Sequence, residues 1–267
     1  MITKRIFALL VLVSSSLVTA NDALDSAINA EHRKDSMARD AFRNPKATLE
    51  FFEIAADHKV LEITPGGSGW YTEILAPYLR DNGHLTIGHF DPNSSSDYYK
   101  RNYKKLVDKF AATPAVYDKV EVGVFATPGK YEYGEDGSFD RVVTFRNVHN
   151  WTRSGDEEMK VIFSSFFKAL KPGGKLGVID HRLPEDREKA YEGGYVKESY
   201  VIGLAEAVGF KLDGKSEVNA NPKDTVESDK GVWRLPPSLR EKDEAQKEKN
   251  RAIGESDRMT LLFVKPE

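Results

Sequence analysis

The chain has 267 residues, a formal charge of −3 at pH 7 and no cysteine. The absence of cysteine excludes disulfides, thiol nucleophiles and cysteine-based metal sites. The near-neutral charge, with no dominant basic block, argues against nucleic acid as a partner. The length is enough for one globular domain with a full core.

The first twenty residues predict an export signal. Lys4 and Arg5 precede an apolar run at 6–13, and Val18-Thr19-Ala20 supplies the small residues of a cleavage site. We therefore expect a signal peptide at 1–20, cleavage after Ala20 and a periplasmic or secreted protein; an uncleaved anchor is the alternative. A spanning helix needs roughly 20 apolar residues, so no stable membrane insertion is expected after cleavage.

Residues 21–58 predict a helical cap. Segment 22–42 has apolar residues at helical spacing, and Arg43-Asn44-Pro45 interrupts the pattern. A second helix is expected at 45–55, because proline fits the first turn of a helix.

Strand and helix patterns alternate through the domain predicted at 59–267. Strands are expected at 59–63, 84–90, 119–125, within 134–148 and at 175–182, and helices at 70–80, 96–112, 155–170 and 195–210. This order predicts an α/β, Rossmann-like, doubly wound parallel sheet. The tail predicts two more strands, at 211–218 and 257–266, separated by a polar insertion at 215–255 that contains a charge-rich helix.

The loop Thr64-Pro65-Gly66-Gly67-Ser68-Gly69 directly follows the first strand. Glycines there let backbone N–H groups approach a ligand ahead of a helix N-terminus. Thr72 stands where a dinucleotide fingerprint needs glycine or alanine. A P-loop is excluded because no Gly-Lys-Ser/Thr follows.

Two acids refine the choice of ligand. Glu62 in the first strand suits an ammonium or sulfonium group, and Asp91 after the second strand suits ribose hydroxyls. Together with the loop they indicate a ligand with a ribose and an amino-acid moiety, such as S-adenosylmethionine. A structural turn with two surface acids is the alternative.

Several segments, in order, resemble the motifs of class I S-adenosylmethionine-dependent methyltransferases: "VLEITPGGSGWYTE", "FDRVVTFRNV", "ALKPGGKLGVID" and "AEAVGFKL". The "FRNV" segment resembles the quinone C-methyltransferase branch. The mature chain, including "VHNW", "GVWRLPP" and "IGESDRMTL", is similar to exported bacterial methyltransferase-like proteins. The resemblance implies a seven-stranded sheet of order 3-2-1-4-5-7-6 with the last strand antiparallel.

We assign cofactor binding to one set of residues near these strand ends: Glu62, Thr64, Gly66, Gly67, Gly69, Asp91 and Asn147. The chain departs from the family at two points. Thr64 replaces the first loop glycine, and no acid follows the third strand.

The base for methyl transfer is expected on the loops after the fourth and fifth strands. His149 is our candidate, because it lies opposite the expected methyl position and histidine titrates near neutral pH; a hydrogen-bonded loop histidine is the alternative. Trp70, Tyr71 and Trp151 are expected either to line a substrate pocket or to belong to the core.

A second interpretation of these strand ends is a divalent-metal site formed by His89, Asp91, His149, Asp180 and His181. We predict no metal, because no pair of these residues has helix-type ligand spacing. Residues Asp224, Trp233 and Arg258 of the tail are expected to cover the cleft together with the N-terminal helices.

The sequence therefore favours an exported S-adenosylmethionine-dependent methyltransferase that acts on a small-molecule or lipid-soluble acceptor. A binding protein that keeps the fold without transfer activity is the alternative.

Overall fold

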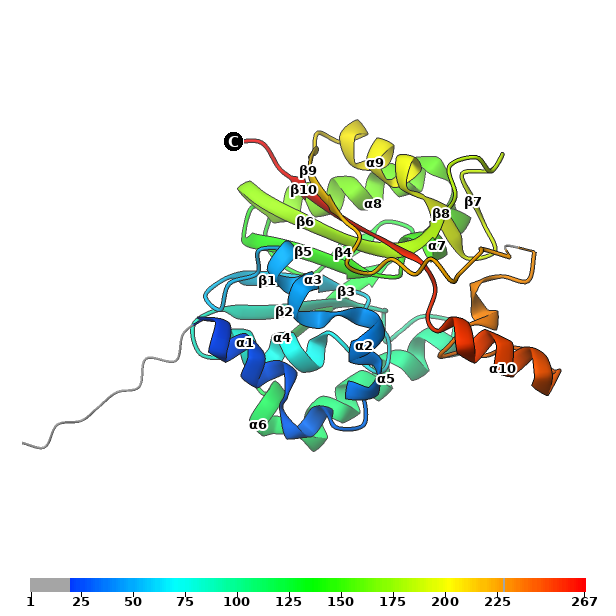
Figure 1. Ribbon diagram of the computed structural model, residues 1–267. Helices are drawn as coiled ribbons and strands as arrows, with labels where there is room; N and C mark the ends of the chain where they lie inside the picture. Colours follow the sequence, from blue (N-terminus) through cyan, green and yellow to red (C-terminus); the bar gives the residue numbers. More distant parts are fainter. Residues whose placement is uncertain (1–19, 228) are drawn as a thin grey trace, which may run out of the picture.

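The computed structural model describes residues 20–227 and 229–267. The expected signal segment lies outside the described residues, apart from Ala20. Within the described part, the chain forms a twisted mixed sheet between two helical layers (Figure 1). The predicted α/β Rossmann-like architecture is confirmed.

The main sheet has the order β4-β3-β2-β1-β5-β6-β10-β9. Its strands are β1 (Lys59–Ile63), β2 (His84–His89), β3 (Glu121–Ala126), β4 (Lys130–Glu132), β5 (Phe139–Phe145), β6 (Leu170–Leu183), β9 (Lys211–Ser216) and β10 (Arg258–Val264). Strands β3, β2, β1, β5 and β6 are parallel, so their carboxyl ends lie at one edge of the sheet, which we call the carboxyl edge. Strand β10 is antiparallel to β6 and begins at this edge, where Arg258 pairs with His181.

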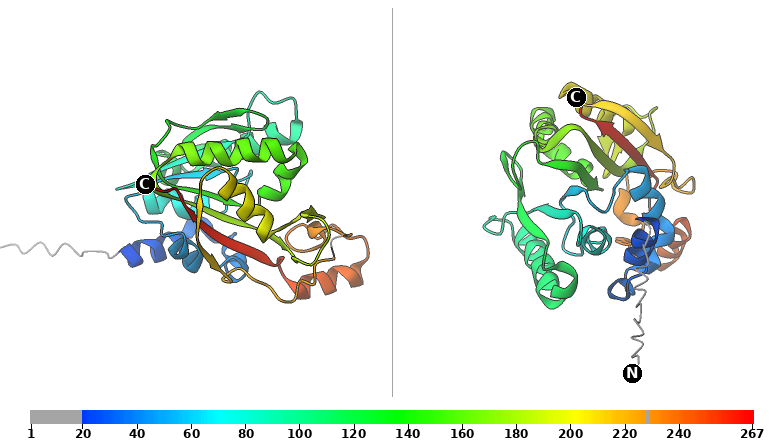
Figure 2. Two further views of the ribbon diagram at one scale, coloured as in Figure 1. Left: turned by 90° about the horizontal axis from the view of Figure 1, so that it is seen from above. Right: turned by 90° about the vertical axis from the view of Figure 1, so that its left-hand side faces the viewer.

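Helices cover both faces of this sheet. One layer contains α8 (Asp156–Ala169) and α9 (Glu198–Ala207), and the other contains α4 (Thr72–Leu79), α5 (Asp97–Ala112) and α6 (Pro114–Tyr117), with α1 (Ala20–Ile28) and α3 (Pro45–Phe51) packed beside them. Figure 2 shows the sheet between these layers. Apolar side chains fill both interfaces, represented by Phe163 and Phe166 of α8 and by Ile74 and Leu75 of α4.

The N-terminal cap differs from the expected pair of helices. The single helix predicted at 22–42 is divided into α1, two short 3-10 turns (Glu31–Arg33 and Met37–Arg39) and α2 (Asp40–Arg43). Polar contacts with α4 explain the break: His32 Nε2 lies 2.8 Å from the carbonyl oxygen of Glu73, and Ser36 donates to the Glu73 carboxylate. Apolar spacing alone carries no signal of these contacts.

Other boundaries also shift. The helix predicted at 195–210 begins only at Glu198, because Tyr195–Lys197 forms β8, which pairs with β6 and with β7 (Tyr191–Glu192). Strand β4, which forms a hairpin with β3, was not predicted. The short helix α7 (Val148–Trp151) and a 3-10 turn (Thr152–Ser154) follow β5 directly.

The tail insertion has a small interior of its own. Asp224 is buried, forms an ion pair with Arg234 at 3.0 Å and accepts a hydrogen bond from the Tyr195 hydroxyl at 3.1 Å. Arg234 belongs to a 3-10 turn (Val232–Arg234), and helix α10 (Glu244–Ile253), the predicted charge-rich helix, follows it before β10. Figure 1 shows α10 at the end of the sheet where β10 begins.

Among the described residues, no helix is both long enough and apolar enough to cross a membrane.

Candidate active site

The loop 64–69, which we call the glycine loop, turns sharply after β1. Gly66 and Gly69 have φ angles of +70° and +57°, a region that glycine enters without steric cost. A Cβ on Gly69 would lie 2.8 Å from Leu106 Cδ1, so this position also needs glycine for space. The loop therefore has the glycine-dependent backbone turn that was expected, although the N–H of Gly67 donates to Asn102 Oδ1 at 3.1 Å.

Thr64 opens the glycine loop in a conformation that a threonine rarely adopts. Its φ is +52°, the left-handed region, which costs a β-branched residue about 1–2 kcal/mol. Its hydroxyl is buried and makes no hydrogen bond with the described residues. The position thus keeps the backbone conformation that a glycine would favour while presenting an unpaired hydroxyl to the loop.

Asn147 fixes the start of the glycine loop. Its Nδ2 donates to the carbonyl oxygens of Ile63 at 3.0 Å and Thr64 at 3.1 Å, and it lies 3.0 Å from Thr144 Oγ1. These contacts tie the end of β5 to the end of β1. Asn147, which we assigned to cofactor binding, therefore uses its side-chain amide nitrogen to hold the protein backbone.

Glu62 lies inside the protein, against the first turn of α4. It is 1% exposed, and its Oε2 accepts a hydrogen bond from Thr72 Oγ1 at 2.7 Å. Burial raises the pKa of the Glu62 carboxyl to about 8, although Thr72 and Lys109 act to lower it. The group therefore carries a proton over much of the neutral range.

Asp91 forms an ion pair with a lysine that was not among the predicted site residues. Lys130 on β4 lies 2.7 Å from Asp91 Oδ2, and the backbone N–H of Asn93 donates to Oδ1 at 2.8 Å. The contact with Lys130 lowers the pKa of the Asp91 carboxyl. The acid expected to accept the ribose hydroxyls thus already has a cationic partner.

A histidine–aspartate pair lies at the ends of β5 and β6. His149 Nδ1 is 2.7 Å from Asp180 Oδ1, and the backbone N–H of His149 donates to Oδ2 at 3.0 Å. The N–H of His181 donates to Oδ1 at 2.7 Å, so a fully buried carboxylate is held from three directions. Because Asp180 occupies Nδ1, the Nε2 atom of His149 is left to accept a proton, as a general base requires.

His181 lies beside this pair in a neutral state. The two histidine rings are 4.9 Å apart, and His181 Nδ1 is 2.5 Å from Ser256 Oγ. Burial lowers the pKa of His181 well below its ordinary value, and His149 and three arginines lower it further.

These arginines belong to a group that we call the arginine cluster: Arg39, Arg43, Arg146 and Arg258, arranged around Glu255. Although burial alone would raise it, the pKa of the Glu255 carboxyl is lowered to about 2 by the four guanidinium groups. The charge next to His181 is therefore strongly positive.

The structure brings together only part of the alternative metal site. His149, Asp180 and His181 offer ligand atoms within 4.8 Å of one another, but His89 and Asp91 are not in this group. His89 is buried at the end of β2, where burial lowers its pKa to about 4. The arginine cluster beside His181 would repel a divalent cation, so the electrostatics oppose a metal here.

The aromatic candidates belong to the core. Trp70 and Tyr71 are each 4% exposed and pack in the α4 layer, and Trp151 packs against Phe125 and Phe166 under α8. Burial against neighbouring rings accounts for their positions near the strand ends. In the part of the chain that the structure describes, these three side chains belong to the packed interior.

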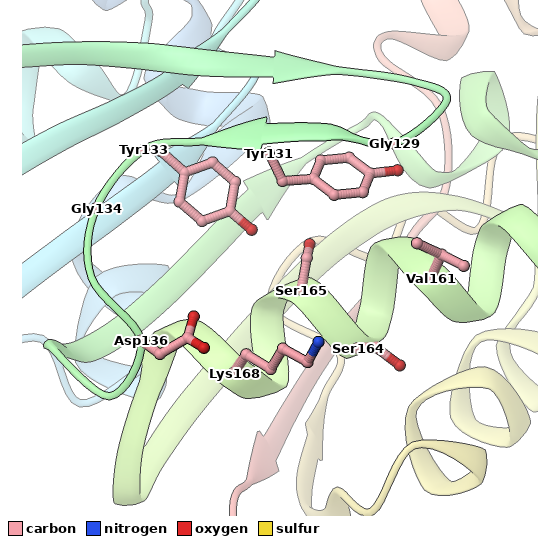
Figure 3. Close-up of a pocket in the computed structure, with 9 residues that line it drawn as sticks. All are labelled: Gly129, Tyr131, Tyr133, Gly134, Asp136, Val161, Ser164, Ser165 and Lys168. Carbon is pink, nitrogen blue, oxygen red and sulfur yellow. The ribbon is translucent and has the colours of Figure 1, made fainter.

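A pocket of about 510 Å³ lies away from these residues, between the β3–β4 hairpin and α8 (Figure 3). Tyr131, Tyr133, Ser165 and Lys168 line it. None of its lining residues is among the candidate site residues.

Comparisons with solved structures identify the fold. A SAM dependent methyltransferase from Aquifex aeolicus matches with a TM-score of 0.55 and 14% identity over 88% of this chain and 96% of its own. A putative sarcosine dimethylglycine methyltransferase from Galdieria sulphuraria matches with a TM-score of 0.53 and 14% identity over 90% of both chains. The [4+2]-cyclase SpnF matches with a TM-score of 0.54 and 15% identity over 85% of this chain and 81% of its own.

No protein-family model and no curated protein matches the chain. At this level of identity the matches show that the protein has the methyltransferase fold. SpnF illustrates that this fold also carries a cyclase.

Proposed function

We propose that the protein is an S-adenosylmethionine-dependent methyltransferase, exported from the cytoplasm, that acts on a small-molecule or lipid-soluble acceptor in the cell envelope. The observation that carries this proposal is the His149–Asp180 pair, which lies at the carboxyl edge on a fold shared with such enzymes. Export rests on the sequence of residues 1–20.

Two features of the glycine loop support this proposal. The buried hydroxyl of Thr64 has no partner among the described residues, and Gly66 has nothing within 4 Å of where its Cβ would stand. Asp91 follows β2, where an acid can accept ribose hydroxyls. Glu62 is buried and protonated, so it offers no carboxylate to the amino group of the ligand. When bound, S-adenosylmethionine would supply an electrophilic sulfonium methyl group.

The residues of the chain then position and deprotonate the acceptor. Methyl transfer depends mainly on proximity and orientation, with a base required when the acceptor atom must lose a proton. His149 Nε2 takes that proton, while Asp180 holds Nδ1 and stabilises the imidazolium that forms. Neutral His181 keeps further positive charge away from the charged His149 ring.

The alternative is a protein that keeps the fold but does not transfer a methyl group. Two observations favour it: Glu62 is bonded to Thr72, and Asp91 is bonded to Lys130. Both acids expected to hold the cofactor are thus satisfied within the protein.

A transfer assay separates the two functions. The mature protein is incubated with S-adenosylmethionine carrying a labelled methyl group and an extract of envelope small molecules, and label in the products is measured. We expect transfer by the wild type and a loss of about 100-fold or more in His149→Ala. Binding of the cofactor without any transfer would favour the alternative, and full activity of His149→Ala would remove His149 as the base.

A further inference from the structure

The arginine cluster carries more positive charge than the protein around it neutralises. Glu255 pairs with Arg39 at 2.7 Å, Arg258 at 3.1 Å and Arg43 at 3.3 Å. Four guanidinium groups and one carboxylate leave three uncompensated charges (4 − 1). The Arg146 side chain makes no hydrogen bond or ion pair with the residues that the structure describes, although it affects the pKa of Glu255.

This excess charge is largely withdrawn from water. Arg43 is 2% exposed and Arg258 3% exposed, and within the described part of the chain Arg43 Nη2 and Arg258 Nε have no hydrogen-bond acceptor. Burial lowers the pKa of Arg146 to about 10, and Arg39 and Arg258 lower it further, against the opposing effect of Glu255. Uncompensated buried charges and donors are costly, so the cluster lacks an anionic partner.

The backbone of Arg146 is also strained. Its φ is +63°, and its N–H donates to the carbonyl oxygen of Ile179 at 2.7 Å. A left-handed conformation at a residue that is neither glycine nor asparagine is uncommon and costs about 1–2 kcal/mol. It occurs at the carboxyl end of β5, three residues before His149, where such strain frequently marks a binding function.

The cluster adjoins the candidate base through a short series of contacts. Arg258 lies opposite His181 in the β10–β6 pairing, and Ser256 contacts His181 Nδ1. The His181 ring is 4.9 Å from the ring of His149. Arg39, with 26% of its side chain exposed, gives the cluster access to solvent. A ligand held by the arginines would therefore have its reacting atom near His149.

We propose that the arginine cluster binds an oxyanion of the acceptor, a carboxylate or a phosphate, and so orients the acceptor toward His149. Guanidinium groups match both anions in paired hydrogen bonds. The orienting role rests on the proposed methyl transfer, whereas binding of the oxyanion does not. An acceptor with an acidic group follows as the substrate class.

Thermal unfolding of the mature full-length protein tests the binding without cofactor. Sodium phosphate, sodium succinate and sodium chloride are titrated at matched ionic strength. We expect a saturable rise in Tm with phosphate or succinate and not with chloride, because a ligand that binds only the native state stabilises it. The more effective of the two identifies the anion. An equal rise with all three salts would overturn the proposal.

Substitutions locate the effect in the cluster. Arg146→Ala and the more exposed Arg39→Ala should each weaken anion binding about tenfold or more, since each removes a charge-assisted contact. Arg80→Ala is the matched control. Arg80 directly follows α4, at the opposite end of the sheet from the arginine cluster, and it pairs with Asp118. Undiminished anion binding in both cluster variants would overturn the proposal.

Glu255→Gln distinguishes binding from a merely structural role. Removing the internal carboxylate frees the guanidinium groups that it holds, so anion affinity should rise even if the protein is less stable. A loss of stability without tighter binding would indicate that the cluster only fastens β10 to the N-terminal helices. Anion binding without methyl transfer would refute the proposed function alone, and transfer to acceptors regardless of an acidic group would refute this inference alone.

Discussion

Substituting Glu62 with glutamine is expected to change how stability depends on pH. Burial raises the pKa of the folded carboxyl from 4.5 to about 8. Between pH 4.5 and about 8 the unfolded chain has released the proton of Glu62, whereas the native state still holds it. The free energy of unfolding therefore falls as the pH rises through this range. With about 1.4 kcal/mol per pKa unit, the ceiling of this loss is about 5 kcal/mol.

Glutamine has nearly the same shape, still accepts from Thr72 and cannot ionise, so Glu62→Gln should lack this loss. Urea unfolding of the wild type and the variant at pH 5, 7 and 9 measures the difference. We expect similar free energies of unfolding at pH 5 and a variant that is clearly more stable at pH 9. Glu206→Gln, on an exposed part of α9, is the control for a surface charge. Parallel stability curves for the wild type and Glu62→Gln would refute the reasoning.

Three further substitutions probe the site. Asp180→Asn should lower kcat about 10²–10⁴-fold with little change in cofactor affinity, because Asn cannot hold the charged form of His149; an unchanged kcat would exclude the pair as base. Thr64→Gly should relieve about 1 kcal/mol of left-handed backbone strain, which chemical denaturation would measure. It should also weaken cofactor binding, measured by calorimetry, because the hydroxyl is lost. A less stable variant would contradict the argument from strain. Lys130→Ala should tighten cofactor binding severalfold by freeing Asp91, and weaker binding would show that Lys130 belongs to the binding site.

The sequence predicted the features that depend on local pattern. Alternating strands and helices, the glycine loop and the tail strand at β10 follow from apolar periodicity and from glycine positions. His149 was selected because it follows the fourth predicted strand. The fold match to methyltransferases agrees with these patterns.

Features that depend on contacts between distant segments were not predicted. Lys130 reaches Asp91 only because an unpredicted three-residue strand folds back on β3. The arginine cluster combines residues from the cap, the loop after β5 and the last strand, more than 200 positions apart. Asp180 was noted after the fifth strand, but its hydrogen bond to His149 required the pairing of β5 with β6.

Calorimetric titration of the protein without residues 1–20 with S-adenosylmethionine tests the central claim most directly. We expect one molecule bound per chain, with affinity sharply reduced in Asp91→Ala. Absence of binding by the wild-type protein at millimolar cofactor would contradict the proposed methyltransferase function.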